Sequence, residues 1–90
     1  MTRHDLMIKP EFFNPVAWGI KCFEIRNNDR GFKKGDRVVL HECNDGNPTG
    51  RVVAVEISYI LTADDFPEGI KDGYCVFGFW VEYTRLEMKE

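Results

Sequence analysis

The segment that decides the fold class reads Arg51-Val52-Val53-Ala54-Val55-Glu56-Ile57-Ser58-Tyr59-Ile60-Leu61. β-branched and aromatic residues fill most of it and it contains no Gly or Pro, a composition typical of strands. Because side chains alternate between the two faces of a strand, we expect one face to carry Val53, Val55, Ile57, Tyr59 and Leu61. The other face then carries Val52, Ala54, Glu56, Ser58 and Ile60. The sequence therefore predicts one long strand.

Shorter segments of similar character flank this strand on both sides. We expect further strands over residues 4–9, 21–26, 37–42 and 74–83, and loops over 27–34, 43–48 and 62–73. In the second of these strands, Phe23 and Ile25 are expected to face one way and Glu24 and Arg26 the other. Pro10 suits the first position of a helix, so a short N-terminal helix is expected over residues 11–18. The pattern indicates a mostly β (α+β) chain whose five to six strands form a small barrel or rolled sheet.

The length and composition place the chain in a narrow class. Ninety residues, with 43% apolar content, make one domain over 1–90. The longest apolar stretch, residues 74–81, is shorter than the roughly 20 residues that a membrane helix needs, and residues 1–5 lack the pattern of a signal peptide. The three cysteines form no C-x-x-C pair, which favours a reducing compartment. We therefore expect a cytoplasmic protein with no membrane contact.

Charge is distributed unevenly along the chain. Residues 1–37 contain eight basic and five acidic residues, whereas residues 38–90 contain four basic and ten acidic residues. If a polyanion binds, the first half is where we expect contact. Ordinary surface charge on a small domain is the alternative explanation.

Patterns that hold metals or activate nucleophiles are sparse. His41 and Cys43 are the one close pair of histidine and cysteine, and zinc sites use richer ligand sets. The single serine, Ser58, falls in the middle of the long strand rather than in a nucleophile turn. Glycine-rich phosphate loops are missing from the sequence. No metal and no cofactor are therefore expected.

The chemically informative segment is Gly19-Ile20-Lys21-Cys22-Phe23-Glu24-Ile25-Arg26, followed by a polar loop. Glu24 and Arg26 share one face of the expected strand, and Lys21 at its start can turn to the same side. Such a group can bind a phosphate through Arg and Lys while Glu accepts a proton from a base or ribose. The alternative is a structural ion pair in which Arg26 or Lys21 neutralises Glu24.

The same segment resembles the ASCH family of the PUA-like superfamily, whose signature is Gly-x-Lys-x-x-Glu-x-Arg. Gly19, Lys21, Glu24 and Arg26 match all four positions. Residues 28–36, 49–51, 59–61 and 73–76 are similar to a small, largely uncharacterised bacterial and phage group within that family. The resemblance covers nearly the whole chain and implies a PUA-like pseudo-barrel with a helix beside a cleft.

The resemblance also implies a function for the cleft. It implies that Lys21, Glu24, Arg26 and, in the following loop, Arg30 bind RNA or a nucleotide-like ligand. One branch of the family hydrolyses N4-acetylcytidine with a lysine, a threonine and a glutamate, but Glu24 stands where that threonine would be. Lys21 and Glu24 as acid and base of a nucleoside amidohydrolase or ribonuclease are therefore the second hypothesis. A phage or bacterial protein-interaction modulator is the third, and the oligomeric state is left open.

Overall fold

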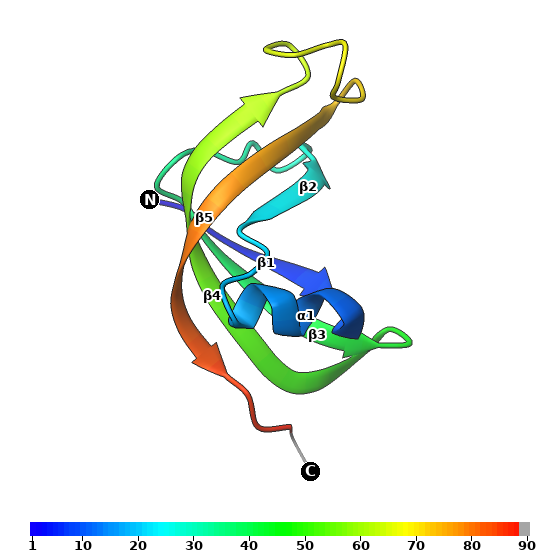
Figure 1. Ribbon diagram of the computed structural model, residues 1–90, viewed down its shortest axis with the longest axis vertical. Helices are drawn as coiled ribbons and strands as arrows, with labels where there is room; N and C mark the ends of the chain where they lie inside the picture. Colours follow the sequence, from blue (N-terminus) through cyan, green and yellow to red (C-terminus); the bar gives the residue numbers. More distant parts are fainter. Residues whose placement is uncertain (89–90) are drawn as a thin grey trace.

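The computed structural model describes residues 1–88 as a five-stranded sheet with one short helix (Figure 1). The elements are β1 (Arg3–Ile8), α1 (Pro10–Ala17), β2 (Phe23–Asn27), β3 (Arg37–Asn44), β4 (Asn47–Thr62) and β5 (Tyr74–Arg85). The last two residues of the domain predicted over 1–90 lie outside the described part. The mostly β prediction is confirmed, with five strands and one short helix near the N-terminus. No helix among the described residues has the length and apolar content needed to cross a bilayer.

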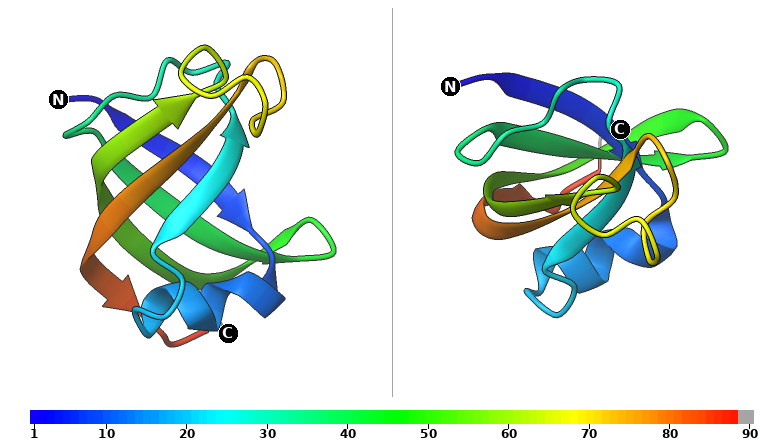
Figure 2. Two further views of the ribbon diagram at one scale, coloured as in Figure 1. Left: turned by 45° about the horizontal axis from the view of Figure 1, so that its top comes forward. Right: turned by 90° about the horizontal axis from the view of Figure 1, so that it is seen from above.

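The strands lie in the order β1-β3-β4-β5-β2. The β1–β3 pair is parallel, and the other three pairs are antiparallel. The sheet curls into a half-barrel, so that the two edge strands, β1 and β2, approach each other (Figure 2). α1 lies across the end of the half-barrel opposite the loop that joins β4 to β5 (Figure 1).

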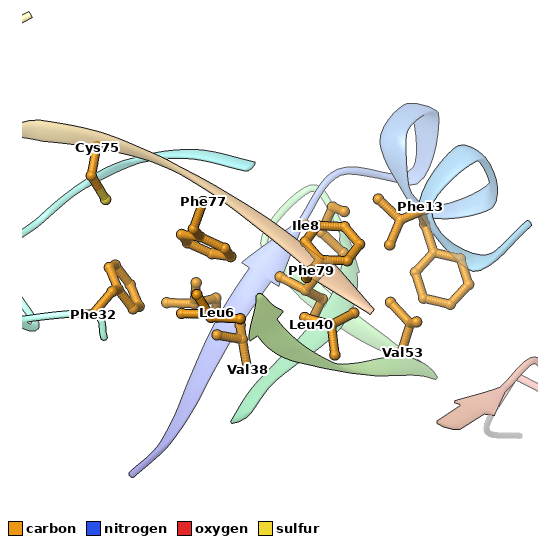
Figure 3. Packing of buried hydrophobic residues seen from close by; sticks show 13 residues of the cluster. Leu6, Ile8, Phe13, Phe32, Val38, Leu40, Val53, Cys75, Phe77 and Phe79 are labelled. Atoms are coloured by element: carbon orange, nitrogen blue, oxygen red, sulfur yellow. The ribbon is translucent and has the colours of Figure 1, made fainter. Parts of the chain in front are cut away.

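The concave face of the sheet holds the main core. Its buried residues are Leu6, Ile8, Phe13, Val16, Phe32, Val38, Leu40, Val53, Val55, Ile57, Cys75, Phe77 and Phe79 (Figure 3). The register that places Leu40 opposite Val53 and Val38 opposite Val55 aligns the inward side chains of β3 and β4. Since each fully buried aliphatic or aromatic side chain contributes about 1.5–3 kcal/mol, this cluster is the main source of stability.

The helix begins at Pro10, one residue before the predicted start. Pro fits there because the first backbone N–H groups of a helix have no intrahelical partner. Pro15 lies inside the helix, which runs for only eight residues. Gly19 follows with a φ of 76°, a conformation that favours glycine after a helix. The helix buries Phe13 and Val16, whereas Phe12 is 42% exposed.

β2 confirms the predicted alternation, with Phe23 and Ile25 on one face and Glu24 and Arg26 on the other, but it starts two residues later than predicted. β2 begins at Phe23, so Lys21 lies in the connection from α1. The apolar residues Phe23 and Ile25 face solvent, at 47% and 60% exposure, while Glu24 is buried at 4%. The charged face points inward because cations meet Glu24 there, as described below, which compensates its burial.

The loop predicted over residues 43–48 is a tight hairpin instead. β3 runs to Asn44 and β4 starts at Asn47, which leaves Asp45 and Gly46 as the turn. Both have positive φ, 51° and 82°. Two consecutive residues with positive φ form the type I′ turn that Asp-Gly favours, and its twist matches that of the flanking strands.

The long strand changes face at Ser58. The β4–β5 register shifts between Ile57 and Tyr59, which marks a β-bulge. Tyr59, predicted to share a face with Val55 and Ile57, is instead 67% exposed, and Ile60 packs against the core. The predicted assignment of faces is therefore right up to Ile57 and wrong beyond it.

Candidate functional site

The side chains of Lys21, Glu24 and Arg26 meet at one point. Lys21 Nζ donates to Glu24 Oε2, and Arg26 Nε donates to Glu24 Oε1 at 3.0 Å. The Glu24 side chain is 6% exposed, whereas those of Lys21 and Arg26 are 20% and 26% exposed. Each carboxylate oxygen is thus held by a cation, and both cations reach solvent.

These three residues lie at the wall of a hollow of about 390 Å³, which we call the seam hollow. The hollow is lined by Met7, Ile8, Lys9, Phe12, Lys21, Phe23, Glu24, Ile25 and Arg26. Three of these side chains are positive and one is negative, so the hollow has a net positive charge. Lys21 Nζ lies 5.6 Å from the ring centroid of Phe12 and 4.9 Å from that of Phe23. The hollow therefore offers cations and aromatic rings to the same ligand.

The connection from α1 to β2 places Lys21. The backbone N–H groups of Ile20 and Lys21 both donate to the carbonyl of Pro15, at 2.9 and 3.0 Å. This turn brings the chain back beside the helix, so that Lys21 Nζ also reaches the carbonyl of Phe23 at 2.8 Å. Lys21 is consequently held in place by the backbone carbonyls of Pro15 and Phe23 as well as by Glu24.

Two arginines bridge the edges of the sheet. Arg26 Nη2 donates to the carbonyl of Met7 at 2.7 Å, and Arg30 Nη1 donates to the carbonyl of Asp5 at 2.9 Å. Across the described chain, no backbone ladder joins β1 to β2. We call this line of side-chain contacts the seam. It closes the half-barrel through guanidinium groups instead of strand pairing.

Arg30 lies outside the seam hollow and lines a neighbouring one. This second hollow, of about 630 Å³, also contains Arg26, Met7, Ile8 and Lys9, so the two hollows are contiguous. Of the four residues singled out from the sequence, Arg26 and Arg30 therefore lie on the seam, and Lys21 and Glu24 line the seam hollow with Arg26. Lys21, Glu24 and Arg26 are in contact, while Arg30 stands beside them.

Sequence reasoning did not assign six of the nine lining residues to the site, and three of the six carry a charge or an aromatic ring: Lys9, Phe12 and Phe23. Both phenylalanines are apolar, yet both are more than two-fifths exposed. One signal was present, because the adjacent Phe12 and Phe13 of a short helix point in different directions. Phe13 is fully buried, so Phe12 was the one available to a ligand.

A second polar group lies on the outer side of β1. Asp5 receives a hydrogen bond from Arg3 at 2.9 Å and lies 2.8 Å from His41 Nε2. Arg3, followed by His41, holds the pKa of Asp5 below its ordinary value. Within residues 1–88, no three His, Cys, Asp or Glu side chains are grouped as a metal site would require.

Fold and site together describe a small half-barrel domain. Arginine side chains close its seam, and the hollow beside the seam is lined by cations and aromatic rings. Residues 3–79 match the family described as Domain of unknown function (DUF3850), and the chain belongs to this family. It is also similar to the "Uncharacterized 12.9 kDa protein in GpA 3'region" of Escherichia phage P2, with 34% identity over 65 residues. That match covers 72% of this chain and 60% of the phage protein, so the chain spans about three-fifths of that relative.

Proposed function

We propose that this protein binds RNA or a nucleotide-like ligand in the seam hollow. We also propose that it is an ASCH domain with a PUA-like pseudo-barrel, on the strength of the signature at Gly19, Lys21, Glu24 and Arg26. The observation that carries the functional proposal is the position of Lys21 Nζ within 5.6 Å of the centroids of two exposed aromatic rings, in a hollow that Arg26 also lines. A phosphate requires the cations, and a base can stack on an aromatic ring.

The size and charge of the seam hollow suit such a ligand. Its volume of about 390 Å³ falls within the range of small-molecule sites, roughly 300–1,000 Å³. Arg26 uses Nε and Nη2 for Glu24 and Met7. Since a guanidinium has five N–H groups, Nη1 remains for a ligand within the described structure. The cations are thus positioned in advance, which reduces the entropy lost on binding.

The acid–base hypothesis receives less support from the geometry. A general base needs a carboxylate oxygen that can accept a proton from the substrate. Both oxygens of Glu24 already accept hydrogen bonds from Lys21 and Arg26. We therefore assign Glu24 the role of holding the two cations in place, and we propose binding rather than hydrolysis as the function.

The proposal is tested by titrating the protein with short single-stranded RNAs and 5′-nucleotides at several salt concentrations. For Lys21→Ala we expect weaker binding and a salt dependence reduced by about 0.7 in log–log slope, since one phosphate contact is lost. Lys34→Ala is the matched control, because Lys34 is exposed and lies outside the seam hollow. Equal effects of the two substitutions would contradict the assignment of the site.

The aromatic contribution is tested separately with Phe12→Ala. Base stacking on an aromatic side chain is worth about 1–3 kcal/mol, or roughly a 5- to 150-fold loss of affinity. Tyr59→Ala removes an exposed ring outside the hollow, 67% exposed against 42% for Phe12, and serves as the control. If Phe12→Ala leaves RNA and nucleotide affinities unchanged, stacking in the seam hollow is ruled out. Product analysis of the same mixtures by mass spectrometry tests hydrolysis.

A further inference from the structure

The convex face of the sheet carries a separate hollow, which we call the outer hollow. Its floor is formed by Val39, Val52 and Ala54, and its rim includes Arg3, Arg37 and Arg85. The floor residues form their own buried cluster, apart from the main core. The volume is about 500 Å³. Short side chains in the middle of the sheet and long ones around them create this concavity.

The register explains how these residues come together. Val39 pairs with Ala54, Ala54 pairs with Tyr83, and Val52 pairs with Arg85. Directly paired residues place their side chains on the same face of a sheet. α1 packs on the opposite face, where Phe13 and Val16 join the main core. The outer hollow is therefore a built feature of the sheet and is independent of the seam hollow.

The rim of the outer hollow has an excess of positive charge. Arg37 pairs with Glu82 at 3.0 Å, and Arg3 pairs with Asp5 at 2.9 Å. Arg85 Nε donates to the carbonyl of Gly50 at 2.9 Å. No carboxylate of the described residues pairs with Arg85, which leaves its charge available. A partner with carboxylates around an apolar group would complement this rim.

The loop that joins β4 to β5 in this same chain has the chemistry that such a partner needs. The loop over residues 63–73 contains Asp64, Glu68 and Asp72, and Phe66 in its middle is 48% exposed. The loop projects from the end of the half-barrel opposite α1 (Figure 1). An acidic loop with an exposed aromatic ring on a projecting end can reach the face of another molecule.

We propose that the 63–73 loop of one copy docks in the outer hollow of a second copy. Phe66 enters over Val39, Val52 and Ala54, while loop carboxylates approach Arg85. The two surfaces differ, so the contact is heterologous and adds copies head to tail. A contact of one loop in one hollow lies below about 1,200 Å² of buried surface, the range of transient complexes. We therefore expect a dissociation constant of about 10 μM to 1 mM.

Sedimentation velocity over a range of protein and salt concentrations tests this assembly. We expect the average mass to rise with protein concentration and to fall with added salt, because the contact is between exposed charges. Glu68→Lys in the loop and Arg85→Glu in the hollow should each weaken self-association at least tenfold. Asp29→Lys makes the same kind of charge change on an exposed loop outside both surfaces and should leave it unchanged.

A mixture of Phe66→Ala and Arg85→Glu separates this contact from a symmetric one. Phe66→Ala keeps an intact hollow and Arg85→Glu keeps an intact loop, so the mixture should form one-to-one dimers that grow no further. Arg3→Glu, at a side chain that is 62% exposed, replaces Arg85→Glu if that variant does not fold. A wild-type protein that is monomeric up to about 1 mM at low salt, or a mixture without dimers, overturns the proposal.

Discussion

Replacing Glu24 by Gln should have opposite effects on stability and on anion binding. The substitution keeps the shape of the side chain but removes the charge that faces Lys21 and Arg26. Breaking a buried ion pair costs about 3–5 kcal/mol. The two cations are 20% and 26% exposed, and solvent screening reduces that cost. We expect a loss of about 1.5–3 kcal/mol in the free energy of unfolding.

Anion affinity should change in the other direction. A phosphate held by Lys21 would lie about 6 Å from the Glu24 carboxylate, where two unit charges repel by about 0.7 kcal/mol in water and about 2.8 kcal/mol at an effective permittivity of 20. Removing that repulsion should tighten the binding of inorganic phosphate roughly 3- to 100-fold.

Urea denaturation followed by tryptophan fluorescence measures the first effect, and calorimetric titration with phosphate measures the second. Glu87→Gln removes the same charge from an exposed position and is the control. If Glu24→Gln weakens phosphate binding as well as stability, the loss of cation positioning outweighs the removed repulsion and the expected gain in affinity is wrong. Unchanged stability would show that the contacts with Lys21 and Arg26 contribute nothing in solution.

Three further perturbations test the surrounding structure. Arg30→Ala removes the hydrogen bond to the Asp5 carbonyl and should cost about 0.5–1.5 kcal/mol, measured by urea denaturation. Burial raises the pKa of Asp36, but the hydrogen bonds that its carboxylate accepts, above all the one from His4, lower it by more. The pKa of Asp36 therefore lies below its ordinary value. The Asp36 carboxylate therefore stabilises the fold at pH values above its pKa in the unfolded chain, near 3.8, and this stabilisation is lost as the pH falls through its pKa in the folded chain. Asp36→Asn should lower the melting temperature at neutral pH and make the melting temperature depend less on pH in the acid range. Arg51→Met leaves the carboxylate of Glu42, which is 2% exposed, without its paired cation and should lower the free energy of unfolding by about 3–5 kcal/mol. Adding Glu42→Gln to the same chain should restore part of that free energy.

Alternation along the sequence was sufficient to predict the central strands. Val53, Val55 and Ile57 share one face as expected, and that face packs in the core, because β-branched residues at every second position have one strongly preferred register. The same reasoning failed beyond Ser58, where a bulge adds one residue and exchanges the faces. The cause is the pairing with β5, which the sequence of β4 does not contain.

β2 shows a different limit of the sequence. An alternating segment with Phe23 and Ile25 on one face is expected to bury that face. The structure buries Glu24 instead because Lys21, from outside the strand, and Arg26 both reach its carboxylate. Two cations from different local structures outweigh the apolar preference of the segment. The trio itself was predicted, but its inward direction depends on contacts that only the folded chain provides.

The seam has a thermodynamic consequence for any ligand that occupies the hollow beside it. Lys9 follows β1 and Lys21 precedes β2, so a ligand that contacts both lysines links the two edge strands of the sheet. Its binding then favours the closed barrel over opened forms, and a ligand at 100 times its dissociation constant adds about 2.7 kcal/mol to the closed state. Amide hydrogen exchange along these edges should slow accordingly. Ligand screening could thus be read directly from exchange protection, with no assay of turnover.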